Sequence, residues 1–141
     1  MRKIISTYFF LLIIGLSYLC PISFAQNNNK AILIGISQYS DSNINQLAFA
    51  DEDVRTFSMM LINYAGYGSA DIVLLLNNEA TKQRIMNTIT DMVRQSQKKP
   101  LDHVILMFAG HGLPPAYKSN TTNSFLAPYD AQFGDFFKES G

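Results

Sequence analysis

Three short runs of apolar residues, separated by two longer amphipathic stretches, set the organisation of this chain. The runs cover residues 30–36, 71–76 and 104–108. Each is too short for a helix and rich in the Ile, Leu, Val and Phe typical of strands in a parallel sheet. We expect the last run, Val104 to Phe108, to be a strand buried on both faces.

The stretches between the runs have helical periodicity. Residues 51–64 begin with three acids that suit the positive end of a helix dipole, and Gly66 is the expected stop. Thr81 can cap the second helix, which ends in two lysines before Pro100. The apolar positions expected on the buried faces are Val54, Phe57, Leu61, Tyr64 and Ala65 in the first helix and Ile85, Ile89, Met92 and Val93 in the second.

The resulting order of strand, helix, strand, helix, strand predicts an α/β fold, a three-layer sandwich in which helices cover both faces of a parallel sheet. The loops that follow the strands then share one edge. After a polar run at residues 118–123, a strand-like return is expected at residues 124–126, and the aromatic residues from Phe133 onward form no completed element. We therefore expect a domain that is incomplete at its C-terminal end.

The first 25 residues differ in kind from the rest. Arg2 and Lys3 precede a short apolar core, and Ser23 and Ala25 lie at the −3 and −1 positions of a cleavage site. This pattern predicts a signal peptide over residues 1–25, a linker over 26–29 and a domain over 30–141, hence export to the periplasm or the exterior. The alternative is an uncleaved segment that holds the protein on the membrane.

Composition excludes several classes of function. The 11 basic and 11 acidic residues balance, which argues against a nucleic-acid surface. Cleavage after Ala25 would leave nine basic and eleven acidic residues and would remove Cys20, the one cysteine, so we expect no disulfide. The chain lacks a glycine-rich dinucleotide turn, a phosphate loop and a G-x-S-x-G elbow, and we expect no cofactor. His103 and His111 lie about 26 Å apart along a strand, too far to share a metal.

The sequence Ala109-Gly110-His111-Gly112 ends the third strand abruptly. Two glycines release the backbone and leave the imidazole at the carboxyl end of the strand, where open α/β sheets bind ligands. A histidine there is a candidate proton-transfer group. The alternative is a histidine that only caps the core or lies on the surface.

Four pieces of sequence together resemble the caspase-like cysteine peptidases, in particular the metacaspase and paracaspase-type branch found in bacteria. They are KAILIGISQY, LAFADEDV, VILMFAGHG and LAPYDA, in the order of that family and within residues 30–130. The resemblance covers about the first two thirds of the family's catalytic domain. It implies a cysteine-type endopeptidase that acts on peptides or proteins.

The resemblance also implies roles for individual residues. His111 matches the catalytic histidine that protonates the leaving amine, and the backbone N–H of Gly112 matches an oxyanion donor. Asp51 matches an acidic position that helps bind a basic P1 side chain, although it could equally serve the helix dipole. Asp41 could add negative charge to the same pocket or could be a solvated turn residue. We expect cleavage after Arg or Lys.

One departure from the family pattern concerns the nucleophile. The family's cysteine follows the histidine by about 50 residues, near position 161 here, whereas Cys20 precedes the fold. Thiolate chemistry requires a thiolate, so we expect residues 1–141 alone to be inactive. Two hypotheses remain: an exported endopeptidase represented by its N-terminal part, and a catalytically inactive caspase-like binding or scaffold module. The retained Gly110-His111-Gly112 turn favours the first.

Overall fold

A computed structural model describes residues 27–113 and 124–136 and contains a three-stranded parallel sheet. Strand β1 (Lys30–Gly35) lies in the centre, with β2 (Ile72–Leu76) on one side and β3 (Val104–Ala109) on the other. Ile32 is in register with Val73 of β2 and with Leu106 of β3. The expected signal peptide and the polar run at residues 118–123 lie outside the described residues.

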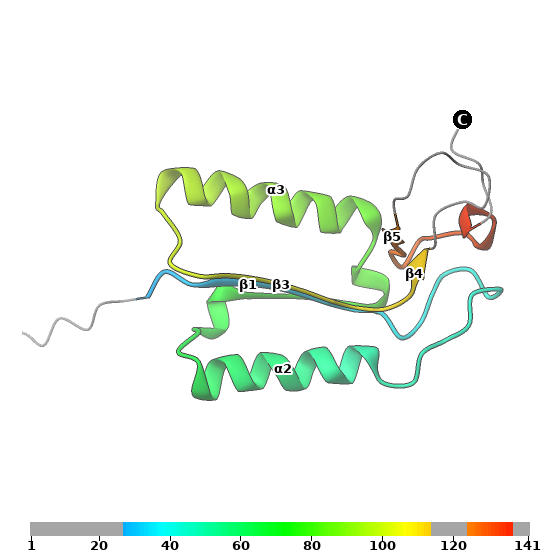
Figure 1. The fold of residues 1–141 in the computed structure, drawn as a ribbon, viewed down its shortest axis with the longest axis horizontal. Coiled ribbons are helices and arrows are strands. Elements are labelled where there is room, and N and C mark those ends of the chain that lie inside the picture. Colours follow the sequence, from blue (N-terminus) through cyan, green and yellow to red (C-terminus); the bar gives the residue numbers. More distant parts are fainter. Residues whose placement is uncertain (1–26, 114–123, 137–141) are drawn as a thin grey trace, which may run out of the picture.

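Two helices connect the strands and cover opposite faces of the sheet (Figure 1). Helix α2 (Ala50–Tyr64) follows β1, and helix α3 (Lys82–Lys98) follows β2. The three layers confirm the predicted α/β sandwich. No helix within the described ranges 27–113 and 124–136 is long and apolar enough to cross a bilayer.

The core consists of two apolar clusters, one on each face of β1. Successive strand residues point to opposite faces, so Leu33 packs toward α2 while Ile32 and Ile34 pack toward α3. All of these side chains are buried. The central strand is thus apolar throughout because both of its faces are covered, as its sequence predicts.

Strand β3 corrects the expectation of a run buried on both faces. Val104 and Leu106 are 49% and 56% exposed, whereas Ile105 and Met107 pack on the α2 side. Among the described residues no strand pairs with the outer edge of β3. The apolar cluster beneath α3 centres on β1 and Leu75 of β2. The side chains of Val104 and Leu106, which lie on the same face of β3, therefore remain partly exposed.

The two helices lie where their periodicity predicts, but each buried face is narrower than expected. Tyr64 is 85% exposed, because ten residues after Val54 the helix stands about 80° away from the buried direction. Ser58 is buried in its place, and Val93 of α3 is also exposed. Ala65, also predicted on the buried face, is exposed and lies just beyond the last residue of α2. These four positions correct the predicted faces.

The ends of the helices follow their predicted signals. The Thr81 hydroxyl accepts a hydrogen bond from the Arg84 N–H at 3.3 Å, as an N-cap of α3 should. Gly66 follows α2 with φ of 72°. Asp71, expected to open the second strand, lies instead in a short 3₁₀ helix, η1 (Ser69–Asp71), where its carboxylate pairs with Lys30.

The described residues after β3 lie at the carboxyl edge of the sheet, at the right of Figure 1. Strands β4 (Gly112–Leu113) and β5 (Phe125–Leu126) pair antiparallel, which confirms the expected return and adds a partner for it. A 3₁₀ helix, η3 (Phe133–Phe136), corrects the expectation that no element forms there. The loop after β1 is fastened to this segment, because the Ser40 N–H donates to the Tyr129 carbonyl at 3.0 Å.

Candidate active site

The candidate site starts where β3 ends, at Gly110. A Cβ atom built on Gly110 would lie 2.9 Å from the Phe108 ring and 3.0 Å from the Tyr39 hydroxyl. A side chain at this position would have to displace the Phe108 ring or the Tyr39 hydroxyl, so the turn favours glycine. The tight turn brings His111 to the carboxyl edge of the sheet, in accordance with the prediction from the Gly-His-Gly sequence.

His111 is held at three atoms by two other segments of the chain. Its backbone N–H donates to the Tyr39 hydroxyl at 2.7 Å, and its carbonyl accepts from the Ala127 N–H at 2.9 Å. Its ring Nε2 lies 2.7 Å from the Asn45 carbonyl oxygen. The position and the orientation of the imidazole are therefore both fixed.

The contact with Asn45 selects a tautomer of the His111 ring. A carbonyl oxygen only accepts hydrogen bonds, so Nε2 must carry the proton that it shares with Asn45. In the neutral ring Nδ1 then has a free lone pair, since one imidazole nitrogen donates and the other accepts. The arrangement suits a ring that takes up and releases a proton at Nδ1.

A second polar cluster lies at the carboxyl ends of β1 and β2. The Asp51 carboxylate accepts from the Ser37 hydroxyl at 2.5 Å and from the Asn77 side-chain amide at 3.1 Å. The hydrogen bond from Ser37 is the main cause that lowers the pKa of Asp51 below its ordinary value. Asp51 is therefore a carboxylate at neutral pH.

Asn77 links the two strand ends that carry this cluster. Its side-chain oxygen accepts from the backbone N–H groups of Ser37 at 2.9 Å and Gln38 at 3.1 Å. Asn77 opens the 3₁₀ helix η2 (Asn77–Glu79) with φ of 48°, in the left-handed region that Asn tolerates better than most residues. The backbone conformation thus aims the amide at both Ser37 and Asp51.

A polar pocket of about 440 Å³ opens beside this cluster. Asp51 and Glu52 give it two carboxylates, and Gln46, the residue after the Asn45 that holds His111, is part of its wall. One loop between β1 and α2 therefore serves both the imidazole and the acidic pocket. The full lining is Ser37, Gln38, Gln46, Leu47, Ala48, Asp51 and Glu52.

Asp41, the other carboxylate expected at the substrate pocket, is absent from that lining. Its carboxylate accepts from the Asn43 and Phe133 backbone N–H groups at 2.9 Å and 2.7 Å. The bond from Phe133 is the main cause that lowers the pKa of Asp41. In this arrangement Asp41 fastens the loop after β1 to η3.

Gly112 lies in β4, one residue beyond the imidazole. It is exposed, and a Cβ atom there would meet only the Phe125 carbonyl, at 3.9 Å. The side of Gly112 on which a side chain would stand is thus open, as a backbone donor that a substrate approaches requires.

Sequence reasoning missed four residues of this site: Ser37, Tyr39, Asn45 and Asn77. Ser37, Tyr39 and Asn45 lie in a loop composed mainly of turn-forming residues, and Asn77 is the first of two asparagines that follow the apolar run at residues 71–76. Tyr39 carried a usable signal, since one aromatic residue among turn formers suggests an anchor. Asn45 carried none, because it acts through a main-chain atom that every residue has.

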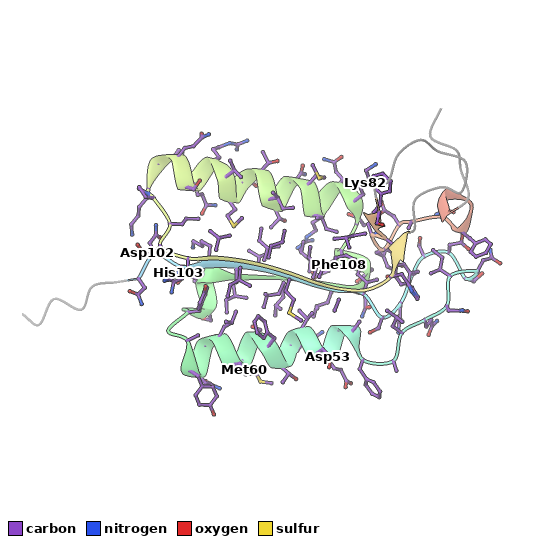
Figure 2. All side chains as sticks on the ribbon, in the orientation of Figure 1. Asp53, Met60, Lys82, Asp102, His103 and Phe108 are labelled. Atoms are coloured by element: carbon purple, nitrogen blue, oxygen red, sulfur yellow. The ribbon has the colours of Figure 1, made fainter. Side chains whose placement is uncertain are left out.

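A second and larger groove, of about 530 Å³, lies between α3, β3 and β5. It is mainly apolar, with Leu106, Phe108 and Phe125 among its walls, and neither His111 nor Asp51 lines it. Figure 2 shows Phe108 near the carboxyl end of the sheet, with Lys82, another wall residue, at the start of α3. This groove is separate from the polar site.

Comparison with known proteins gives matches to one group. A sequence model described as "Caspase domain" matches residues 28–140. "Metacaspase-1" of Scheffersomyces stipitis is 27% identical over 101 residues, which cover 67% of this chain and 24% of that protein. "Metacaspase-1" of Schizosaccharomyces pombe is 32% identical over 95 residues, 64% of this chain and 22% of that protein. The match therefore spans about a quarter of the length of either relative.

Proposed function

The chain belongs to the caspase-domain family, a family of cysteine peptidases, and from that premise we propose that it provides the histidine half of an endopeptidase site. The observation that carries the proposal is the Asn45 carbonyl 2.7 Å from Nε2 of His111. It leaves Nδ1 as the nitrogen that exchanges protons with a thiol and with the substrate.

The proposed reaction follows from this geometry. Nδ1 of His111 takes the proton of a cysteine thiol, and the thiolate attacks the carbonyl carbon of the scissile peptide. The backbone N–H of Gly112 donates to the oxyanion that forms. Nδ1–H then protonates the leaving amine, and a water molecule, deprotonated by the same nitrogen, hydrolyses the thioester.

The thiol in this scheme comes from outside residues 27–136. The printed sequence has one cysteine, Cys20, which precedes β1. We accordingly expect cleavage only where a thiolate reaches Nδ1 of His111.

We further propose that the substrate carries Arg or Lys at P1. The support is the polar pocket with the Asp51 and Glu52 carboxylates, next to the loop that holds His111. The lowered pKa of Asp51 keeps its charge at neutral pH, where it attracts a cationic side chain. Asp41 supports the same pocket indirectly, by holding the far part of the loop to η3.

The test compares His103 and His111, the histidines that flank β3, in the full-length natural product. His103 lies at the amino end of the strand (Figure 2) and provides the matched control. We expect His111→Ala to abolish cleavage of peptides with Arg or Lys at P1 and His103→Ala to leave it unchanged. The melting temperature of both variants should stay within a few degrees of the wild type.

Two results would contradict this scheme. Retained cleavage by the His111→Ala variant would remove the histidine from the mechanism. An intact, folded product without any cleavage would instead support the alternative of a caspase-like binding or scaffold module.

We also propose that the protein is exported through residues 1–25. The support is the charged start, the short apolar core and the small residues before position 26. The mass of the mature product from the native host decides this point. A chain that begins at Gln26 supports cleavage, whereas a mass that includes residues 1–25 contradicts it.

A further inference from the structure

Tyr39 is a buried aromatic residue within the polar loop after β1. It is 8% exposed and belongs to the apolar cluster on the α3 side of the sheet. Burial raises the pKa of its hydroxyl, which therefore stays protonated at neutral pH. A buried hydroxyl needs a hydrogen-bond partner, and this one reaches across to the end of another strand.

The partner is the backbone of the proposed catalytic histidine. The Tyr39 hydroxyl accepts from the His111 N–H at 2.7 Å, and the two rings lie with centroids 5.3 Å apart and planes tilted by 38°. The same hydroxyl is one of the atoms that leave no room for a side chain at Gly110. Tyr39 therefore touches the turn before the histidine, its main chain and its ring.

The hydroxyl group does something that the aromatic ring alone cannot. The ring fills space in the core, and a phenylalanine would fill the same space. The hydroxyl satisfies a partly buried N–H that would otherwise lack an acceptor. Without it, the Gly110–His111 peptide would rotate toward another acceptor, and the ring would lose its alignment with the Asn45 carbonyl.

We propose that Tyr39 is a positioning residue, whose hydroxyl holds the His111 backbone so that Nε2 meets the Asn45 carbonyl and Nδ1 stays available. The expected effect of Tyr39 on kcat rests on the proposed function, whereas its effect on the orientation of His111 does not. Tyr39 does not touch the reacting atoms and acts through His111.

The experiment replaces Tyr39 by Phe in the full-length natural product, with Tyr67→Phe as the matched control. Tyr67 is also a buried tyrosine, at 6% exposure, but it belongs to the cluster on the α2 side of the sheet. Three quantities are measured: amide exchange at His111, the ¹⁵N shifts of its ring nitrogens, and kcat and KM on a peptide with Arg at P1.

We expect Tyr39→Phe to speed exchange of the His111 amide at least about tenfold and to lower the fraction of the Nε2–H tautomer. Because small misplacements of a catalytic group cost rate rather than binding, kcat should fall about 10- to 100-fold with KM unchanged. Tyr67→Phe should change none of the three quantities.

Unchanged exchange and unchanged ring shifts would overturn the proposal, and so would altered exchange with kcat intact. If no peptide is cleaved by the wild type, the proposed function fails, and amide exchange and ring shifts still decide the role of Tyr39. If the Tyr39→Phe variant does not fold, amide exchange of the wild type tests the proposal. Rapid exchange of the His111 amide contradicts the hydrogen bond to the Tyr39 hydroxyl, and protection of this amide supports it.

Discussion

The two ends of the same three strands carry polar networks with different purposes. At the amino end, Lys30 pairs with Asp71 at 2.7 Å, and the Asn28 backbone N–H donates to the Asp102 carboxylate at 2.7 Å. Figure 2 shows Asp102 beside His103 at this end. At the carboxyl end, hydrogen bonds hold His111 and Asp51 in place.

The two ends differ in whether polar groups stay available to a ligand once their hydrogen bonds and ion pairs have formed. At the amino end, the contacts join Asn28 and the first residue of β1 to the segments that lead into β3 and β2, and they close the strand ends. At the carboxyl end, the bond from Nε2 leaves Nδ1 of His111 free to react, and the bonded Asp51 still lines a pocket. Stability is therefore the expected readout at one end, and activity at the other.

The largest effect is expected at Gly35, the last residue of β1, which packs directly against the start of α2 and Asp51. A Cβ there would lie 2.7 Å from the Ala50 carbonyl oxygen and 2.9 Å from Cα of Asp51. Gly35→Ala should push the start of α2 away from β1, lower the free energy of unfolding by about 1–3 kcal/mol and also impair cleavage.

Gly134→Ala is the control for this substitution, because a Cβ at Gly134 meets nothing within 4 Å. Urea unfolding of both variants measures the effect. Equal free energies of unfolding for the two variants would show that α2 can shift away from β1 without loss of stability. The close packing at Gly35 would then not couple the stability of the fold to the site.

The next effect concerns Asp51 and separates the two interpretations of that residue. Asp51 and Asp53 both lie in the first turn of α2, but Asp51 bonds to Ser37 and lines the pocket, whereas Asp53 is exposed. If Asp51 binds a basic P1 side chain, Asp51→Asn should lower kcat/KM for Arg substrates about tenfold or more.

The matched variant Asp53→Asn should leave kcat/KM unchanged. A favourable helix dipole alone would give both variants a similar small loss of stability, about 0.3–1 kcal/mol, and no effect on cleavage. Steady-state kinetics combined with thermal unfolding distinguishes these outcomes.

The smallest effect is expected at the amino end, for Asp71→Asn. Lys30 is the main cause that lowers the pKa of Asp71, so the pair stabilises the fold at pH values above the unfolded pKa of 3.8. The contribution is lost as the pH falls through the lowered folded value. At pH 7 the variant should lose less than about 1 kcal/mol, with activity intact.

Unfolding measured from pH 7 to pH 2 checks this prediction. The stabilities of the wild type and the Asp71→Asn variant should converge as the pH falls through the lowered pKa of Asp71, where its carboxylate takes up a proton. A difference that grows toward acid would mean that the ion pair does not stabilise the fold.

Local patterns predicted the parts of this molecule that depend on neighbouring residues. The strand β1, the N-cap Thr81 and the turn at Gly110 follow from apolar runs, a hydroxyl and the absence of a side chain. The apolar run of β3 led to a wrong prediction of burial on both faces. An apolar run has the same composition whether its strand lies at the edge of a sheet or between two others.

The sequence singled out two ionisable side chains of the candidate site and none of the groups that orient them. His111 and Asp51 are chemically distinctive, so their residue types suggest roles. Asn45 contributes a carbonyl and Tyr39 a hydroxyl from the loop after β1, and long-range contacts of this kind leave no periodic trace in one sequence. Only the fold brings positions 66 or 72 residues apart into contact.

The outer margin of β3 has a consequence for handling the protein in the laboratory. Val104 and Leu106 stand half exposed beside a backbone edge on which no described residue forms a strand. Such a margin is a template for strands of other molecules. A preparation limited to residues 27–136 should therefore aggregate at high concentration. Its solubility should improve when it is co-expressed with a polypeptide that adds a strand beside β3.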